Sequence, residues 1–266
     1  MSGASGEALV LAERDGAVLR LTLNRPGARN ALSKQLMSAL EEELASSAAD
    51  DSVSVIVLAA NGPAFCAGHD LREMNDCRAS ADKGEAAFAA IFAQCSWLMQ
   101  MIVRHPVPII AEVQDVATAA GVQLVASCDL AIASTSARFA TPGVNIGLFC
   151  STPMVALSRN VARKHAMEML LTGELVSAEE AARIGLINRA VAPADLKSET
   201  MKLARLVASK PHGAIKIGKE AFYRQLEMGL AEAYEYASRI MTENMLNTEA
   251  CEGIGAFLEK RKPDWR

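Results

Sequence analysis

The sequence has 266 residues, of which 51% are hydrophobic and 22% are charged, with 17 Gly and 9 Pro. These values are typical of a folded globular protein, and they exclude a disordered chain, a collagen-like repeat and a small disulfide scaffold. The formal net charge of −4 lacks the excess of Lys and Arg that binds nucleic acid or an acidic membrane. We therefore expect neither a nucleic-acid partner nor a membrane partner.

The cysteines and the N-terminus bear on the cellular compartment. Six scattered cysteines form no CxxC pair, and no His stands at metal-ligand spacing, which predicts reduced thiols and no metal site. The opening letters MSGASGEAL lack the basic and apolar regions of a signal or transit peptide. We find no apolar run near the roughly 18 residues of a membrane span. Together these features predict a cytoplasmic protein.

The first predicted elements are a hairpin, a helix and a buried strand. Alternating residues at 9–13 and 17–23 flank Asp15-Gly16, a strong signal for a hairpin turn. Ser33 is a preferred N-cap residue, and the apolar spacing after it predicts a helix to about residue 50. The continuous apolar run 53–60 predicts a strand buried on both faces.

The middle of the chain continues with helices and strands in alternation. The polar stretch 75–84 predicts a mobile loop. We expect helices at 87–103 and 120–127 and strands at 107–113 and 130–133.

The C-terminal part of the sequence is helical. A helix is predicted at 163–171, and Ser177-Ala178-Glu179-Glu180 has the spacing of a capping box that begins another. From about residue 193 only helices are predicted, with a break at Lys210-Pro211.

Two small-residue loops could present backbone N–H groups to a ligand. The segment Ala67-Gly68-His69-Asp70-Leu71 follows a predicted buried strand. The segment Thr118-Ala119-Ala120-Gly121 leads into a helix, whose first N–H groups have no partner within the helix. Two such donors that converge on one oxygen would form an oxyanion hole. On local features alone, two tight loops packed in a core are the favoured explanation of these residues, because Gly-containing loops are common.

Short motifs in a fixed order cover nearly the whole chain. They are Leu23-Asn24-Arg25-Pro26, Asn30-Ala31-Leu32, 65–71, 108–113, Gly121, 128–133, Arg138-Phe139, Leu171-Thr172-Gly173, 181–186 and 252–261. In this order the motifs resemble the crotonase (enoyl-CoA hydratase/isomerase) superfamily. Residues 139–145 and 147–153 most resemble its enoyl-CoA hydratase domain-containing protein 3 branch.

The resemblance implies an α/β protein with the crotonase (ClpP-like) fold. In this fold, coiled ββα units form two roughly perpendicular sheets, and a C-terminal helical trimerisation region follows. By resemblance, residues 1–194 form the core with the acyl-CoA site, and residues 195–266 form the trimerisation region. A homotrimer or homohexamer is expected.

The resemblance also implies an acyl-CoA thioester as the ligand, with coenzyme A as part of the substrate and no separate cofactor. The N–H groups of His69 and Ala120 would form the oxyanion hole. Lys260 would approach the CoA phosphate of its own subunit or of a neighbouring one. The full set of predicted substrate contacts is Ala28, Arg29, Ala31, Ala67, His69, Asp70, Leu71, Ala120 and Lys260.

The sequence departs from the hydratases of this family at both of their acid/base positions. Gln123 and Gly143 stand where the hydratases carry the two Glu residues that hold and activate water. An amide has no titratable proton near pH 7, and Gly has no side chain. Because each general acid or base contributes about 10²–10⁴-fold, we expect hydration to be weak or absent.

Other residues leave the reaction open. Gly68-His69-Asp70 resembles the decarboxylating branch of the family, so His69 could support decarboxylation of a malonyl-type acyl-CoA; a loop histidine with a structural role is the equal alternative. A non-catalytic acyl-CoA-binding module is a further alternative. Cys150 is expected to be a small buried hydrophobe rather than an acid, and Asp115 a solvated carboxylate.

Overall fold

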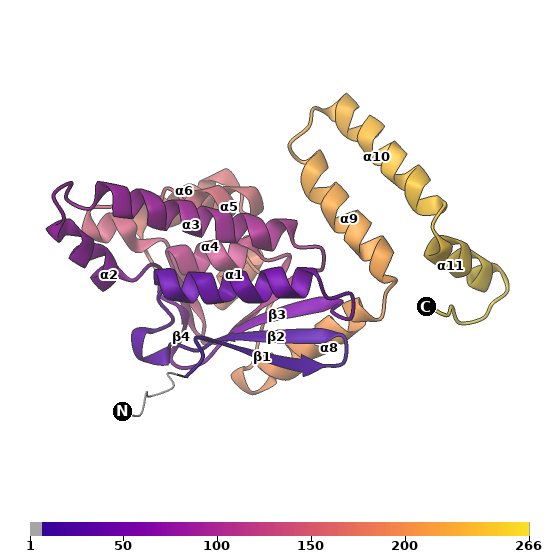
Figure 1. The fold of residues 1–266 in the computed structure, drawn as a ribbon, viewed down its shortest axis with the longest axis horizontal. Coiled ribbons are helices and arrows are strands. Elements are labelled where there is room, and N and C mark those ends of the chain that lie inside the picture. The colour runs from indigo at the N-terminus through magenta and orange to yellow at the C-terminus, as the bar shows by residue number, and fades with distance from the viewer. Residues whose placement is uncertain (1–6, 266) are drawn as a thin grey trace.

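The computed structural model describes residues 7–265, and its strands form two sheets (Figure 1). The predicted lack of a targeting peptide rests on residues 1–9, of which 1–6 lie outside the described part. The six-stranded sheet has the order β1 (Val10–Asp15), β2 (Val18–Leu23), β3 (Val55–Ala60), β5 (Ile109–Val113), β7 (Leu130–Ser134), β10 (Arg189–Val191). The four-stranded sheet has the order β4 (Ala64–Cys66), β6 (Val116–Thr118), β8 (Arg138–Ala140), β9 (Val176–Ser177).

The opening hairpin and the first helix form as predicted. Strands β1 and β2 pair antiparallel from Val10↔Leu23 to Asp15↔Val18, and β3, β5, β7 and β10 continue the sheet in parallel. Helix α1 (Lys34–Ala48) begins after Ser33, whose hydroxyl accepts a hydrogen bond from the Leu36 N–H at 3.2 Å. The apolar face of α1 is buried in the main core.

The predicted loop at 75–84 is wrong at its start. Helix α2 (Leu71–Asp76) and a 3₁₀ turn, η2 (Cys77–Ala79), occupy the beginning of this polar segment. The Asp70 carboxylate accepts the N–H groups of Arg72 and Glu73 at 3.0 and 3.2 Å, so a cap stabilises α2. Because α2 has six residues and buries none of them, its apolar pattern is too short for a helix to be recognised in the sequence.

Helix α3 (Glu85–Arg104) corrects the expectation about apolar runs. Within the described residues it is the one helix long and apolar enough to span a membrane by length and composition. Its side chains from Ile91 to Ile102 contribute to the main core, and it packs against α1 and against α4 (Ala120–Ser127). Core helices pass the same test, so α3 does not by itself indicate a membrane span.

The next helices surround the sheets. Every residue of α4 is buried. Helix α8 (Leu196–Ala208) packs on the larger sheet, where Met201 and Ala204 contact the valines of β2 and β3. The remaining elements of this region are η1 (Pro26–Ala28), η3 (Pro142–Ile146), α5 (Pro153–Asn160), α6 (Arg163–Thr172), α7 (Ala178–Arg183) and η4 (Pro193–Asp195).

The last helices, α9 (His212–Gln225), α10 (Leu230–Met245) and α11 (Thr248–Leu258), form an arm. Figure 1 shows α10 and α11 standing apart from the sheets. A buried ion pair joins α9 to the core, since Lys219 Nζ lies 2.7 Å from Asp129 Oδ2. The Tyr223 hydroxyl donates to the other carboxylate oxygen at 3.0 Å. Large apolar side chains of α10 and α11 remain exposed in the single chain, with Phe257 81% exposed.

Candidate active site

The two predicted N–H donor loops leave neighbouring parallel strands at the same edge of the smaller sheet. Strands β4, β6 and β8 are parallel, with Cys66 opposite Ala117 and Ala117 opposite Phe139. The loop with His69 follows β4, and α4 follows β6. The carboxyl ends of parallel strands are the usual place for ligand sites in α/β proteins.

The backbone of His69 is positioned by a single parallel bridge to Leu32. The Leu32 N–H donates to the Gly68 carbonyl at 2.7 Å, and the Asp70 N–H donates to the Leu32 carbonyl at 3.1 Å. Because the groups on both sides of His69 face Leu32, the N–H of His69 itself points the other way. Ala120 is the first residue of α4, so its N–H has no acceptor within the helix.

These two donors lie beside each other because the turns that carry them are in contact. A Cβ atom on Gly68 would lie 3.0 Å from Ala119 Cβ and 3.6 Å from Ala120 N. A Cβ on Gly121 would lie only 2.1 Å from the Cys66 carbonyl oxygen, so α4 packs directly against the end of β4. Ala119 has φ 50° and ψ −116°, a strained conformation for a residue with a side chain. This packing forms a cradle of backbone N–H groups suited to an oxyanion.

The segment around residues 28–31 is bound to the same loop. The Ala67 N–H donates to the Arg29 carbonyl at 3.1 Å, and Arg25 Nη1 lies 2.7 Å from Asp70 Oδ2. Burial alone would raise the pKa of Asp70, but the Arg25 guanidinium and backbone N–H groups lower it. Of the predicted substrate contacts, the structure brings together Ala28, Arg29, Ala31, Ala67, His69, Asp70, Leu71 and Ala120.

Lys260 does not join this group within the single chain. It follows α11, and this helix lies at the end of the arm, on the other side of the molecule from α2 (Figure 1). A contact between Lys260 and a CoA bound at this site stays a prediction that requires a second copy of the chain.

Gln123 lies inside the site region, at 4% exposure on α4. Its Oε1 lies 3.9 Å from Cys95 Sγ on α3. Burial raises the pKa of the Cys95 thiol to about 12, so the thiol keeps its proton and can donate to the amide oxygen. Sequence reasoning missed Cys95, because a cysteine on the apolar face of a helix resembles any other small core residue.

Gly143 is buried where the backbone leaves no room for a side chain. A Cβ atom at this position would lie 2.7 Å from the Leu148 carbonyl oxygen and 2.9 Å from Cys150 Sγ. The Leu148 N–H donates to the Gly143 carbonyl at 2.9 Å and holds this turn closed. Burial raises the pKa of Cys150, an effect that the Gly143 backbone partly opposes, so the thiol stays protonated.

The His69 side chain carries unsatisfied polar atoms. Both ring nitrogens are buried, and neither has a hydrogen-bond partner among residues 7–265. The ring meets Phe92 edge to face, with centroids 5.5 Å apart. Burial lowers the pKa of His69. The imidazole is therefore neutral near pH 7 and can either donate or accept one hydrogen bond.

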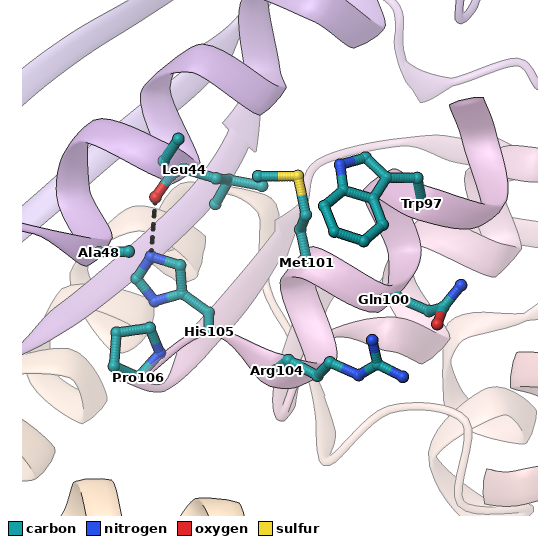
Figure 2. Close-up of a pocket in the computed structure, with 9 residues that line it drawn as sticks. Leu44, Ala48, Trp97, Gln100, Met101, Arg104, His105 and Pro106 are labelled. Atoms are coloured by element: carbon teal, nitrogen blue, oxygen red, sulfur yellow. Dashed lines mark hydrogen bonds between the residues drawn. The ribbon is translucent and has the colours of Figure 1, made fainter. Parts of the chain in front are cut away.

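A groove of about 200 Å³ lies elsewhere, between α1 and α3 (Figure 2). None of the predicted site residues lines it. In this groove the His105 ring hydrogen-bonds the Leu44 carbonyl at 3.1 Å, so this histidine has a structural role. Within the described residues, no group of three or more His, Cys, Asp or Glu side chains is placed to hold a metal ion.

Comparison with known proteins decides the family. The sequence model of the enoyl-CoA hydratase/isomerase family matches residues 13–266. The chain belongs to this family. An enoyl-CoA hydratase from Mycobacterium smegmatis has a similar crystal structure, with a TM-score of 0.93, 52% identity and coverage of 97% of this chain and 99% of that one.

Two further relatives carry the name of the predicted branch. Human enoyl-CoA hydratase domain-containing protein 3 has a crystal structure that matches with a TM-score of 0.91 and 45% identity, over 97% of this chain and 100% of that one. The mouse protein of the same name is 47% identical over 253 residues, which are 95% of this chain and 82% of the relative. The predicted family, branch and crotonase fold are therefore confirmed.

The predicted cytoplasmic location is contradicted by the same comparison. The mouse, human and Xenopus laevis relatives are all named as mitochondrial proteins. The composition and the opening residues, on which the prediction rested, do not distinguish the two compartments for a protein of this family.

Proposed function

We propose that this protein binds acyl-CoA thioesters and holds the thioester oxygen between the N–H groups of His69 and Ala120. Contact between the turns at Gly68 and Ala119 supports this arrangement, because it brings both donors to one place. The loop at 28–31 and the Ala67–Leu71 backbone would accommodate the CoA portion, which belongs to the substrate; no separate cofactor is needed.

The proposal extends to assembly. Residues 1–194 would carry the site, and residues 195–266 would join copies into a homotrimer or homohexamer. The exposed apolar side chains of α10 and α11, such as Leu230 and Phe257, support burial against a second copy. Lys260 would then reach the CoA phosphate of a neighbouring subunit.

The reaction that defines hydratases would be weak or absent in this protein. The observation that carries this conclusion is the closed backbone at Gly143, where the Leu148 carbonyl fills the space of a side chain. At the other position, Gln123 can orient water but cannot remove or supply a proton near pH 7. Loss of two acid/base groups, at about 10²–10⁴-fold each, outweighs what an oxyanion hole alone recovers.

Decarboxylation of a malonyl-type acyl-CoA is the second candidate, favoured by the unpartnered ring nitrogens of His69. In this reaction the bond between the α-carbon and the carboxylate breaks and carbon dioxide leaves. The electron pair forms an enolate whose oxygen the two N–H groups would stabilise, and a proton then returns to the α-carbon. No paired carboxylates are required. A module that binds acyl-CoA without turnover is the remaining alternative.

A panel of three measurements separates these functions. Isothermal titration with butyryl-CoA tests binding, loss of the conjugated enoyl chromophore of crotonyl-CoA tests hydration, and carbon dioxide release from methylmalonyl-CoA tests decarboxylation. We expect binding without hydration at rates typical of the family. The variant His69→Gln should slow decarboxylation and leave butyryl-CoA binding unchanged, whereas butyryl-CoA that fails to bind would refute the proposal.

A further inference from the structure

Thr141 carries a polar atom that the fold does not satisfy. The residue is completely buried, and its Oγ1 has no hydrogen-bond partner in the part of the chain that the structure describes. Buried hydroxyl groups in native proteins nearly always have a partner, and exceptions occur where a ligand or an ordered water completes the pair. The position of Thr141 favours a ligand over an ordered water as the missing partner.

Thr141 lies directly beside the oxyanion turn. It follows the last residue of β8, Ala140, which stands opposite Thr118 of β6. The Ala119 N–H donates to the Ala140 carbonyl at 2.9 Å, so the backbone before Thr141 is fastened to the residue that precedes Ala120. Gly143 follows two residues later. Thr141 therefore stands between the oxyanion turn and the position that holds the second Glu in hydratases.

The unpartnered groups of this region come from two strand ends. His69 follows β4 and has two buried ring nitrogens without partners, and Thr141 follows β8 with its unpaired hydroxyl. A plain alkyl chain bound at the oxyanion hole would leave all of these atoms unpaired, which costs binding free energy. An acyl group with an oxygen substituent could pair with them.

We infer that Thr141 recognises an oxygen substituent on the acyl group, close to the thioester carbonyl. The ligand class is an acyl-CoA that bears a carboxylate or a hydroxyl within the first carbons of its acyl chain. The Thr141 hydroxyl donates its hydrogen bond to that oxygen. This inference rests on the proposed acyl-CoA site, and it makes Thr141 a residue that determines substrate specificity.

The test compares two variants in which a buried threonine is replaced by valine. Thr141→Val removes the hydroxyl and keeps the shape of the side chain. Thr200→Val is the matched control, because Thr200 is also fully buried with an unpartnered Oγ1 but lies on α8, away from the site. Both variants are expected to melt no lower than the parent protein, since each removes a hydroxyl that makes no bond in the fold.

Titration calorimetry with butyryl-CoA, 3-hydroxybutyryl-CoA and methylmalonyl-CoA provides the readout. We expect Thr141→Val to weaken binding of an oxygen-bearing ligand by about tenfold and to leave butyryl-CoA unchanged. The ligand that loses affinity shows whether the site takes a hydroxyl or a carboxylate. Thr200→Val should bind all three ligands like the parent protein.

The outcomes keep this inference distinct from the proposed function. If butyryl-CoA binds but Thr141→Val binds both oxygen-bearing ligands as the parent does, the inference is overturned and the acyl-CoA site stands. If the parent binds none of the three thioesters, both fail. Should Thr141→Val misfold, Thr141→Ser and Thr141→Ala replace it: the serine variant is expected to retain selectivity for the oxygen-bearing ligand, and equal selectivity in the alanine variant contradicts the inference.

Discussion

The closed backbone at Gly143 allows a direct test of why this chain lacks a second carboxylate. In Gly143→Ala, the new Cβ would lie 2.7 Å from the Leu148 carbonyl oxygen and 2.9 Å from Cys150 Sγ. Carbon makes favourable contacts at about 3.5–4.0 Å, so the Leu148 backbone must move for the methyl group to fit. Overpacking of this kind costs about 1–3 kcal/mol of the free energy of unfolding.

Gly229→Ala is the matched control. Gly229 has φ −68°, and a Cβ atom there meets nothing within 4 Å. Gly229 is also the N-cap residue of α10, where Gly is preferred to Ala, so this substitution is expected to cost about 0.5–1 kcal/mol of the free energy of unfolding. Urea denaturation of both variants, followed by circular dichroism, measures the difference. If Gly143→Ala is as stable as Gly229→Ala, the space at Gly143 is not closed and the steric argument is refuted.

The double variant Gln123→Glu with Gly143→Glu extends this prediction to catalysis. We expect it to lose stability and to remain far below the hydration rates of the family, because the displaced turn cannot hold the second carboxylate in place. The crotonyl-CoA assay measures this directly. Hydration at family rates, with stability retained, would show that the two side chains alone account for the missing activity.

Three further predictions concern other parts of the molecule. Gly121→Ala would place a Cβ 2.1 Å from the Cys66 carbonyl oxygen, so we expect at least about 3 kcal/mol of destabilisation in urea and loss of butyryl-CoA binding; a parental binding constant would contradict this packing. Because burial lowers the pKa of His69 below its ordinary value of 6.5, the unfolded state binds the proton more readily, and stability falls as the pH drops below about 6.5. His69→Gln should flatten this dependence between about pH 7.5 and 5.5, and an unchanged slope would show that His69 is not its source. Lys219→Met leaves the Asp129 carboxylate without its cation, so about 3–5 kcal/mol of stability should be lost and α9 should become sensitive to limited proteolysis; parental resistance would show that the pair does not anchor the arm.

Elements with strong local signals could be predicted from the sequence. The hairpin at Asp15-Gly16, the helix capped by Ser33 and the buried strand β3 each depend on residues within one turn or one strand. Helix α2 could not be predicted, because it buries none of its residues and only the partly buried Met74 packs against the core. Strands β6 and β9, with three and two residues, are too short for any alternating pattern.

The candidate site also has features that could be predicted from the sequence and features that could not. The loops with His69 and Ala120 could be found from their sequence because small residues mark both turns. Three features could not: the Cys95 contact with Gln123, the closed turn at Gly143 and the unsatisfied hydroxyl of Thr141. The Cys95 contact joins residues 28 apart in the chain, and the Thr141 hydroxyl is recognised only by the absence of a partner. The turn at Gly143 is closed by the path of the nearby backbone at Leu148, which no residue pattern specifies.

The two kinds of catalytic group in this family differ in how they respond to sequence change. The proposed oxyanion donors are backbone N–H groups, so they would persist while Gly68 and Gly121 allow β4 and α4 to stay in contact. The acid and base are side chains, and single substitutions remove them without disturbing that contact. A donor of this kind contributes about 10²–10³-fold to a reaction with a developing oxyanion. Under the proposed function, the arrangement at Gly68 and Gly121 would therefore still support enolate chemistry where hydration is lost, so loss of hydration would not imply loss of catalysis.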